Sequence, residues 1–236
     1  MVYDDLASED LLALAPSQAE RVFVGKRGGE PSVPQATIDA KLVELARAGR
    51  RVVRLKGGCP SVFSRVSSEA RALAAAGVAY KLLPGVSSAL AAPLLAGFPL
   101  TDAVLGRSFA VATAHDLGAL DFRALAAMDT AVFLMGGRVL GAIAEKLMAA
   151  GRADSTPVAV VRWAGTPQQR VWEGSLSRIA HDTAGEELSP GAFACIALRM
   201  CVQCLSRCAA VIVVGEVVRL RAEFQAGAEA EPGQSA

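Results

Sequence analysis

The chain has 236 residues, of which 53% are hydrophobic, and its formal net charge at pH 7 is +1. This length suits one large domain or two small ones with apolar cores, and the near-neutral charge argues against a nucleic-acid partner. The longest uncharged stretch, 82–101, contains Pro84, Pro93 and Pro99, so we expect no membrane-spanning helix.

Short β-branched runs alternate with Ala- and Leu-rich helical patterns along the chain. We expect strands, in chain order, at residues 20–27, 51–58, 79–85, 107–116, 130–137, 156–165 and 209–220. Helical patterns such as TIDAKLVELARAG and RVLGAIAEKLMAAG lie between them and end in glycine, as helices commonly do. A hairpin is expected near 160–176. The alternation predicts an α/β fold with mainly parallel sheets.

The chain is expected to form two αβα domains. We place the boundary in the loop at 99–106, which gives domains over 1–105 and 106–220 and a disordered tail over 221–236. Four of the five cysteines fall between 195 and 208, where no Gly or Pro turns the chain around a metal. The two histidines, His115 and His181, also lack metal-ligand spacing, so we expect no metal site.

In open α/β sheets, ligands bind at the carboxyl ends of the strands. The residues expected there are Asp4, Lys26, Arg27, 57–59, 84–88, His115, Met135, Gly136 and 163–166. They are rich in glycines, hydroxyl groups and cations, whereas the chain contains no GxxxxGK[ST] loop, GxGxxG fingerprint or G-x-S-x-G elbow. These patterns by themselves predict a cleft for a small anionic molecule.

Several segments carry a more specific resemblance. They include VYDDLAS at 2–8, VFVGKR at 22–27, RLKGG at 54–58, PSVFSR at 60–65, LPGVSSA at 83–89 and VVRWAG at 160–165. Together they resemble the tetrapyrrole methylase family, which has the class III methyltransferase fold. The resemblance covers nearly all of 2–220 except the cysteine-rich segment, and the combination of VGKR with RLKGG is specific to the branch that methylates uroporphyrinogen III.

The resemblance implies an activity and a cofactor. Such enzymes are two-domain homodimers that transfer methyl groups from S-adenosylmethionine to two pyrrole carbons of uroporphyrinogen III. The product is precorrin-2, a precursor of sirohaem and corrinoids. By motif match, the donor pocket is lined by Gly57, Gly58, Cys59, Val62, Ser87, Ser88, Met135, Ala164 and Gly215.

The chemistry of the transfer suggests roles for three further residues. The pyrrole carbon attacks the sulfonium methyl group and must later lose a proton, so a carboxylate beside the ring is suitable. The resemblance implies Asp4 for this role, with Lys26 and Arg65 beside it. Lys26, Arg27 and Arg65 can also bind the carboxylates of the substrate.

Each assignment also has a structural alternative. Asp4 can cap the helix that begins near Ser8, and Ser87 and Ser88 can cap the helix that follows them. The cations can be solvated or engaged in structural ion pairs. Met135 can simply pack in the core.

The chain departs from the family pattern in three places. It begins after the strand and GxGPGD-type loop with which the family opens, so we expect the fold to lack its first strand. GGCPSVFSR stands where the family has GGDPFVFGR, so Cys59 replaces a carboxylate that accepts hydrogen bonds. Losing that acceptor costs about 1–3 kcal/mol if its partner stays buried. Residues 191–208 have no counterpart in the family, and we interpret them as translated intron or mis-joined exon sequence.

These departures leave two alternatives open. The chain can be an inactive paralogue or truncated product that keeps the fold, or a methylase of another tetrapyrrole. A reducing compartment is expected, either the cytoplasm or, for a eukaryotic source whose targeting peptide is absent here, the plastid stroma.

Overall fold

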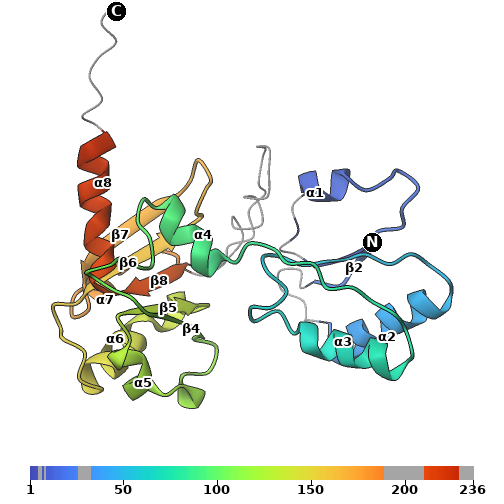
Figure 1. The fold of residues 1–236 in the computed structure, drawn as a ribbon, viewed down its shortest axis with the longest axis horizontal. Coiled ribbons are helices and arrows are strands. Elements are labelled where there is room, and N and C mark those ends of the chain that lie inside the picture. Colours follow the sequence, from blue (N-terminus) through green and yellow to red (C-terminus); the bar gives the residue numbers. More distant parts are fainter. Residues whose placement is uncertain (5–6, 8, 26–32, 189–209, 229–236) are drawn as a thin grey trace, which may run out of the picture. The chain divides into compact units, whose positions relative to one another are not determined.

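The structure is a computed structural model that describes residues 1–4, 7, 9–25, 33–188 and 210–228 (Figure 1). The described residues form two compact units, the first over Met1–Ser87 and the second starting at Ser88. The boundary that we expected near residue 105 lies inside the second unit. The reason is that α4 (Ser88–Leu95) and the buried Phe98 pack on the sheet of the second unit.

The first unit contains a parallel sheet with strand order β2-β1-β3. In chain order its elements are β1 (Val2–Tyr3), α1 (Glu9–Ala13), β2 (Val22–Phe23), α2 (Gln35–Arg47), β3 (Arg54–Leu55) and α3 (Val66–Ala75). Val2 and Val24 pack against Ile38 and Leu42 of α2 to form the core. Because the strands are parallel, their carboxyl ends meet at one edge of the sheet.

The strand expected at 79–85 does not form. No described strand pairs with residues 79–85, and residues 78–83 line a cavity of about 640 Å³ together with Arg54 of β3. A strand needs a hydrogen-bonded partner strand, and without one these residues have no regular secondary structure; Leu83 is 65% exposed. The prediction at 79–85 is therefore wrong.

The second unit contains a mixed sheet with strand order β4-β5-β8-β6-β7. Its strands are β4 (Phe109–Thr113), β5 (Thr130–Leu134), β6 (Pro157–Arg162), β7 (Arg170–Ser175) and β8 (Val211–Val214). β4 and β5 are parallel, whereas β8 runs antiparallel to both of its neighbours. β6 and β7 form the hairpin that was expected near 160–176. Mainly parallel pairing thus describes the first sheet but not the second.

Helices cover both faces of this sheet. The remaining helical elements are η1 (Leu117–Ala119), α5 (Phe122–Ala127), η2 (Gly137–Val139), α6 (Leu140–Ala149), α7 (Ile179–Asp182), η4 (Glu216–Arg219) and α8 (Leu220–Ala228). Alternate residues of β6 and β8 enter two separate cores, one under α6 and α7 and the other under α4 and η4. Figure 1 shows α5 and α6 on one side of the sheet and α4 on the other.

Residues 221–228 are helical, which corrects the expectation of a disordered tail beginning at 221. Arg221 donates from Nε to the carbonyl oxygen of Ala96 at 2.7 Å and also pairs with Glu173, so the start of α8 is held to the unit. Lys26, Arg27 and the segment 191–208 lie outside the described residues. Among the helices that are described, none is long and apolar enough to cross a membrane.

Candidate functional site

Backbone strain marks the loops that leave three strands at their carboxyl ends. Phe63 and Arg65 follow β3, Met135 follows β5 and Trp163 follows β6, with φ values of 45°, 60°, 60° and 51°. In the part of the chain that the structure describes, these are all the non-glycine residues with positive φ. Such conformations cost of order 1–3 kcal/mol each and cluster at functional sites. They point to the strand carboxyl ends as the candidate site in each unit.

In the first unit, the loop after β3 packs against a second glycine-containing segment. Gly58 has φ of 78°, and a Cβ atom on Gly85 would lie 2.5 Å from the carbonyl oxygen of Gly58. Only glycine at position 85 permits this approach. The expected site residues Gly58 and Cys59 therefore lie in backbone contact with Gly85 of the LPGVSS segment.

Cys59 is held by its neighbours. Its Sγ lies 3.0 Å from Oγ of Ser61, and this bond, together with the backbone N–H groups of Gly85 and Ser61, lowers the pKa of the Cys59 thiol. The cationic neighbours Arg54 and Lys56 make ion pairs with carboxylates instead of approaching the thiol. The thiol is thus stabilised in its anionic form by hydrogen bonds alone.

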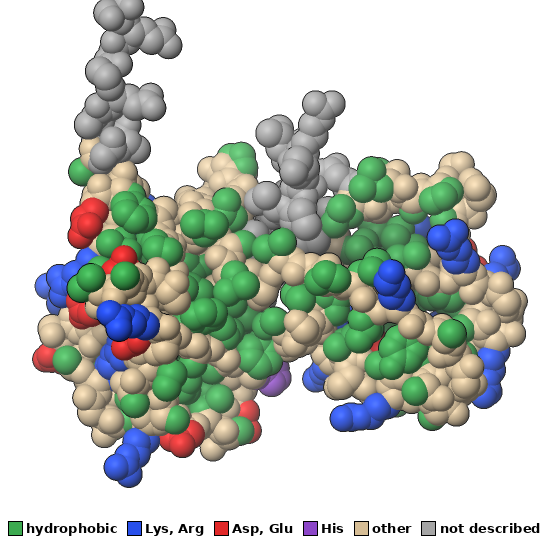
Figure 2. Space-filling view, viewed as in Figure 1, with side chains coloured by type: hydrophobic (Ala, Val, Ile, Leu, Met, Phe, Trp, Pro, Cys, Tyr) green, Lys and Arg blue, Asp and Glu red, His purple; other side chains and the backbone are tan. Residues whose placement is uncertain are grey.

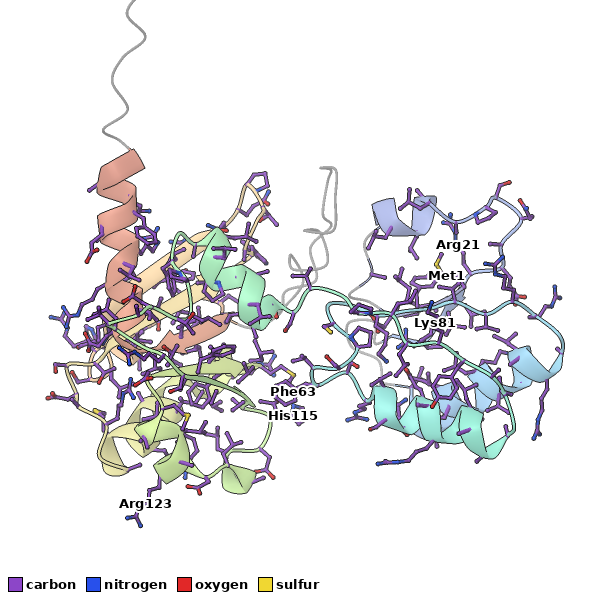
Figure 3. The ribbon with its side chains drawn as sticks, in the orientation of Figure 1. Met1, Arg21, Phe63, Lys81, His115 and Arg123 are labelled. Carbon is purple, nitrogen blue, oxygen red and sulfur yellow. The ribbon has the colours of Figure 1, made fainter. Side chains whose placement is uncertain are left out.

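The rest of this loop leads into α3. The backbone N–H of Val62 donates to the carbonyl oxygen of Cys59 at 3.1 Å, closing a turn, and Oγ of Ser64 donates to the carbonyl oxygen of Pro60. Figure 3 shows Phe63 on this loop, where its ring is exposed. Arg65 is also exposed, and it has no ion pair among the described residues. The structural ion pair considered for Arg65 is therefore absent from that part of the chain.

Asp4 belongs to a network of four charged side chains. It follows β1, and its Oδ2 accepts a hydrogen bond from Nη2 of Arg54 at 3.0 Å. Nε of Arg54 donates to Oε1 of Glu69 at 3.1 Å, and Nζ of Lys56 lies 2.8 Å from both oxygens of Glu69. Burial lowers the pKa of the Lys56 ammonium despite the bond to Glu69. Sequence patterns did not indicate this network, because Glu69 lies on a helix with no local signal linking it to Asp4.

Ser87 and Ser88 are both buried, and Ser88 is the first residue of α4. This position is compatible with the helix-capping role and with a ligand contact. The two residues fall on opposite sides of the division between the units.

In the second unit, the carboxyl ends of β4, β5 and β6 lie at one edge, because these three strands run in the same direction. Met135 follows β5 and is 43% exposed, so it does not serve as a core residue. Ala164 follows β6, is buried and adjoins Trp163, on whose ring the guanidinium of Arg162 stacks at 3.9 Å. Figure 3 shows His115, which follows β4 and is exposed.

Gly215 does not belong to this group. It follows β8, which runs antiparallel to β5 and β6, and its N–H donates to the carbonyl oxygen of Pro157 at the amino end of β6. Because β6 is six residues long, Gly215 lies roughly 20 Å from the edge at which β4, β5 and β6 end. A Cβ atom at Gly215 would lie 2.7 Å from the carbonyl oxygen of Asp129, so close packing explains this glycine.

The surface of the first unit carries many cations. On the face shown in Figure 2, Lys and Arg side chains are spread over this unit, with few acidic side chains among them. The described residues contain no cluster of three or more His, Cys, Asp or Glu side chains that could hold a metal ion.

Comparison with protein families decides the class. The model of the tetrapyrrole (corrin/porphyrin) methylases matches residues 1–180. The chain belongs to the tetrapyrrole methylase family. The resemblance found in the sequence is thereby confirmed, and with it the α/β fold class.

Individual proteins of this family are similar to this tetrapyrrole methylase over most of its length. It is 48% identical over 221 residues to a uroporphyrinogen-III C-methyltransferase of Synechococcus elongatus, covering 94% of this chain and 83% of that protein. It is 37% identical to a siroheme synthase of Edwardsiella ictaluri, of which the match covers only 44%. The crystal structure of the Thermus thermophilus uroporphyrin-III C-methyltransferase, complexed with S-adenosylhomocysteine, matches with a TM-score of 0.69 and 34% identity, covering 93% of this chain and 86% of that one.

Proposed function

We propose that this protein transfers methyl groups from S-adenosylmethionine to uroporphyrinogen III and so forms precorrin-2 for sirohaem or corrinoid synthesis. The observation that carries the proposal is the high identity, over almost the whole chain, to a uroporphyrinogen-III C-methyltransferase. The Thermus thermophilus enzyme, which has the same fold, binds the demethylated product of the donor.

The donor is assigned to the strained loops and their neighbours. By motif match, the residues that we propose for donor binding are Gly57, Gly58, Cys59, Val62, Ser87, Ser88, Met135 and Ala164. Backbone groups at the partly buried glycines and hydroxyl groups at the buried serines offer hydrogen-bonding partners to a polar nucleoside and an amino-acid group. The expectation for Gly215 is withdrawn, because its place at the far edge of the sheet is explained by packing.

The methyl transfer itself needs alignment and proton removal. The pyrrole carbon forms a bond to the methyl carbon of the donor. At the same time the bond between the methyl carbon and sulfur breaks, and its electron pair stays on sulfur, which leaves neutral S-adenosylhomocysteine. The cationic macrocycle then loses a proton, and we propose that the Asp4 carboxylate accepts it. The exposed Arg65 and, by motif, Lys26 can bind carboxylates of the substrate.

A second candidate function is a fold-retaining protein without transferase activity. It is favoured by Cys59, which stands where the family pattern has a carboxylate.

Calorimetric titration of the purified chain with S-adenosylhomocysteine separates the two candidates. We expect micromolar binding by the wild type and, because the carboxylate acceptor is restored, binding tighter by about fivefold or more in Cys59→Asp. Cys59→Ser is the matched control, since it changes the side chain without adding a charge. Absence of binding by the wild type and by Cys59→Asp would overturn the proposal. If the chain binds S-adenosylhomocysteine but methylates another tetrapyrrole and not uroporphyrinogen III, that tetrapyrrole is its substrate instead.

We also propose a homodimer, as the family resemblance implies, which light scattering of the purified chain tests directly. A single mass near 24.4 kDa would contradict it. The plastid stroma stays a prediction that depends on a eukaryotic source. The relatives described above are bacterial and lend it no support.

A further inference from the structure

We propose that Arg54 is a positioning residue that orients the Asp4 carboxylate for proton removal, and that Glu69 and Lys56 hold Arg54 in place. This inference rests on the proposed role of Asp4 as the proton acceptor. It concerns residues that the motif comparison did not assign.

The register of the sheet brings these side chains to one face. Val2 pairs with Arg54, and Tyr3 pairs with Leu55. Side chains alternate along a strand, and paired residues share a face, so Arg54, Lys56 and Asp4 all project from the same side of the sheet. Glu69, in the first turn of α3, meets them there.

The guanidinium of Arg54 is fixed by three separate acceptors. Nη2 donates to Asp4 at 3.0 Å, Nε to Glu69 at 3.1 Å, and Nη1 to the carbonyl oxygen of Leu55 at 2.6 Å. The side chain is only 14% exposed. A planar guanidinium held at three points has a single orientation, so its Nη2 offers the Asp4 carboxylate a donor at a fixed position.

Glu69 anchors the arrangement. Its side chain is 6% exposed, and a carboxylate so deeply buried requires paired charges. Arg54 and Lys56 supply two cations to Glu69 and Asp4, so the network is balanced in charge. Because Lys56 bonds to both oxygens of Glu69 independently of Arg54, we expect Glu69 to stay paired and the fold to tolerate a substitution at Arg54.

A double-mutant cycle on methyl transfer tests the inference. Arg54→Lys keeps the positive charge but cannot contact three acceptors in the same geometry. In the wild-type background we expect kcat to fall by about tenfold to a hundredfold, the effect of a misplaced catalytic group, with an unchanged KM for the donor. In an Asp4→Asn background, Arg54→Lys should lower kcat no further, because Arg54 acts only through Asp4. Arg51→Lys, an exposed arginine in the same segment, is the control.

Two results would overturn the inference. One is an equal loss of kcat in both backgrounds, which would indicate a general structural role. The other is a crystal structure of Arg54→Lys in which the Asp4 carboxylate keeps its wild-type position. This second measurement does not depend on activity, so an inactive wild type would contradict the proposed function while the positioning role is still tested.

Discussion

Cys59 and Ser61 depart from the family pattern together. The family has an aspartate and a phenylalanine at these positions, whereas here a thiol lies 3.0 Å from a hydroxyl group. The hydrogen bonds from Ser61 and from the backbone of Gly85 stabilise negative charge on sulfur. These bonds favour the thiolate form of Cys59 at the position where the family pattern has a carboxylate.

The lowered pKa makes the reactivity of Cys59 testable. A lowered pKa means that the thiolate, which is the nucleophile, is present at lower pH than in an unperturbed cysteine. Ser61→Ala removes the largest cause of this shift, so the pH at which iodoacetamide alkylation of Cys59 is half-maximal should move upward. Peptide mass spectrometry distinguishes this residue from the other four cysteines.

The matched control is Ser64→Ala, because Ser64 bonds to Pro60 and not to the thiol. An unchanged profile in Ser61→Ala would show that Ser61 does not stabilise the thiolate. If the donor binds here as proposed, S-adenosylhomocysteine should also slow the alkylation of Cys59.

At the scale of elements, the loop after β3 depends on a close approach between two backbone segments. Phe63 and Arg65 adopt left-handed conformations within this loop, and Gly85 supports it from the neighbouring segment. Strained conformations of this kind persist only where surrounding contacts hold them, and the approach of Gly85 to Gly58 and Cys59 is one such contact at the start of the loop.

Gly85→Ala should disturb this loop. The added Cβ would lie 2.5 Å from a backbone oxygen, which cannot move without the loop, so we expect a loss of about 1–3 kcal/mol in the free energy of unfolding. Affinity for S-adenosylhomocysteine should fall as well. The control is Gly141→Ala in α6, where the nearest atom is 3.7 Å away and helix propensity favours alanine. Equal stability of Gly85→Ala and wild type in urea would contradict this account.

At the scale of the whole molecule, the two units differ in their cores. The buried core cluster of the first unit consists, among the described residues, of Val2, Val24, Ile38 and Leu42. The second unit has two larger clusters, one on each face of its sheet, and all six residues of β6 are buried. Because hydrophobic burial is the main stabilising contribution to folding, the first unit should be the less stable.

Amide hydrogen exchange measures this difference directly. Peptides from α2 in the first unit should exchange faster than peptides from β6 in the second, although both are regular elements. Since a ligand stabilises the state that binds it, S-adenosylhomocysteine should slow exchange in the loop at 57–65. Equal protection of α2 and β6 in the unliganded protein would contradict the proposed order of stability.

The agreement between sequence and structure depends on how local each signal is. The alternation of β-branched and Ala-rich segments predicts most strands and helices, since side-chain periodicity acts within a few residues. The close contact between Gly58 and Gly85 is also consistent with the RLKGG and LPGVSSA motifs in which these glycines lie. The strand predicted at 79–85 fails, because a strand needs a partner edge that no local pattern can supply.

The sequence by itself determined the family, the α/β class and the loops that carry the candidate site, because these depend on motifs and spacing along the chain. Only the tertiary structure decided that β8 runs against its neighbours, which separates Gly215 from Met135 and Ala164. It also brought Glu69 to Arg54 and Asp4. Strand direction and buried ion pairs are set by packing between residues far apart in the chain, and no spacing in the sequence encodes them directly.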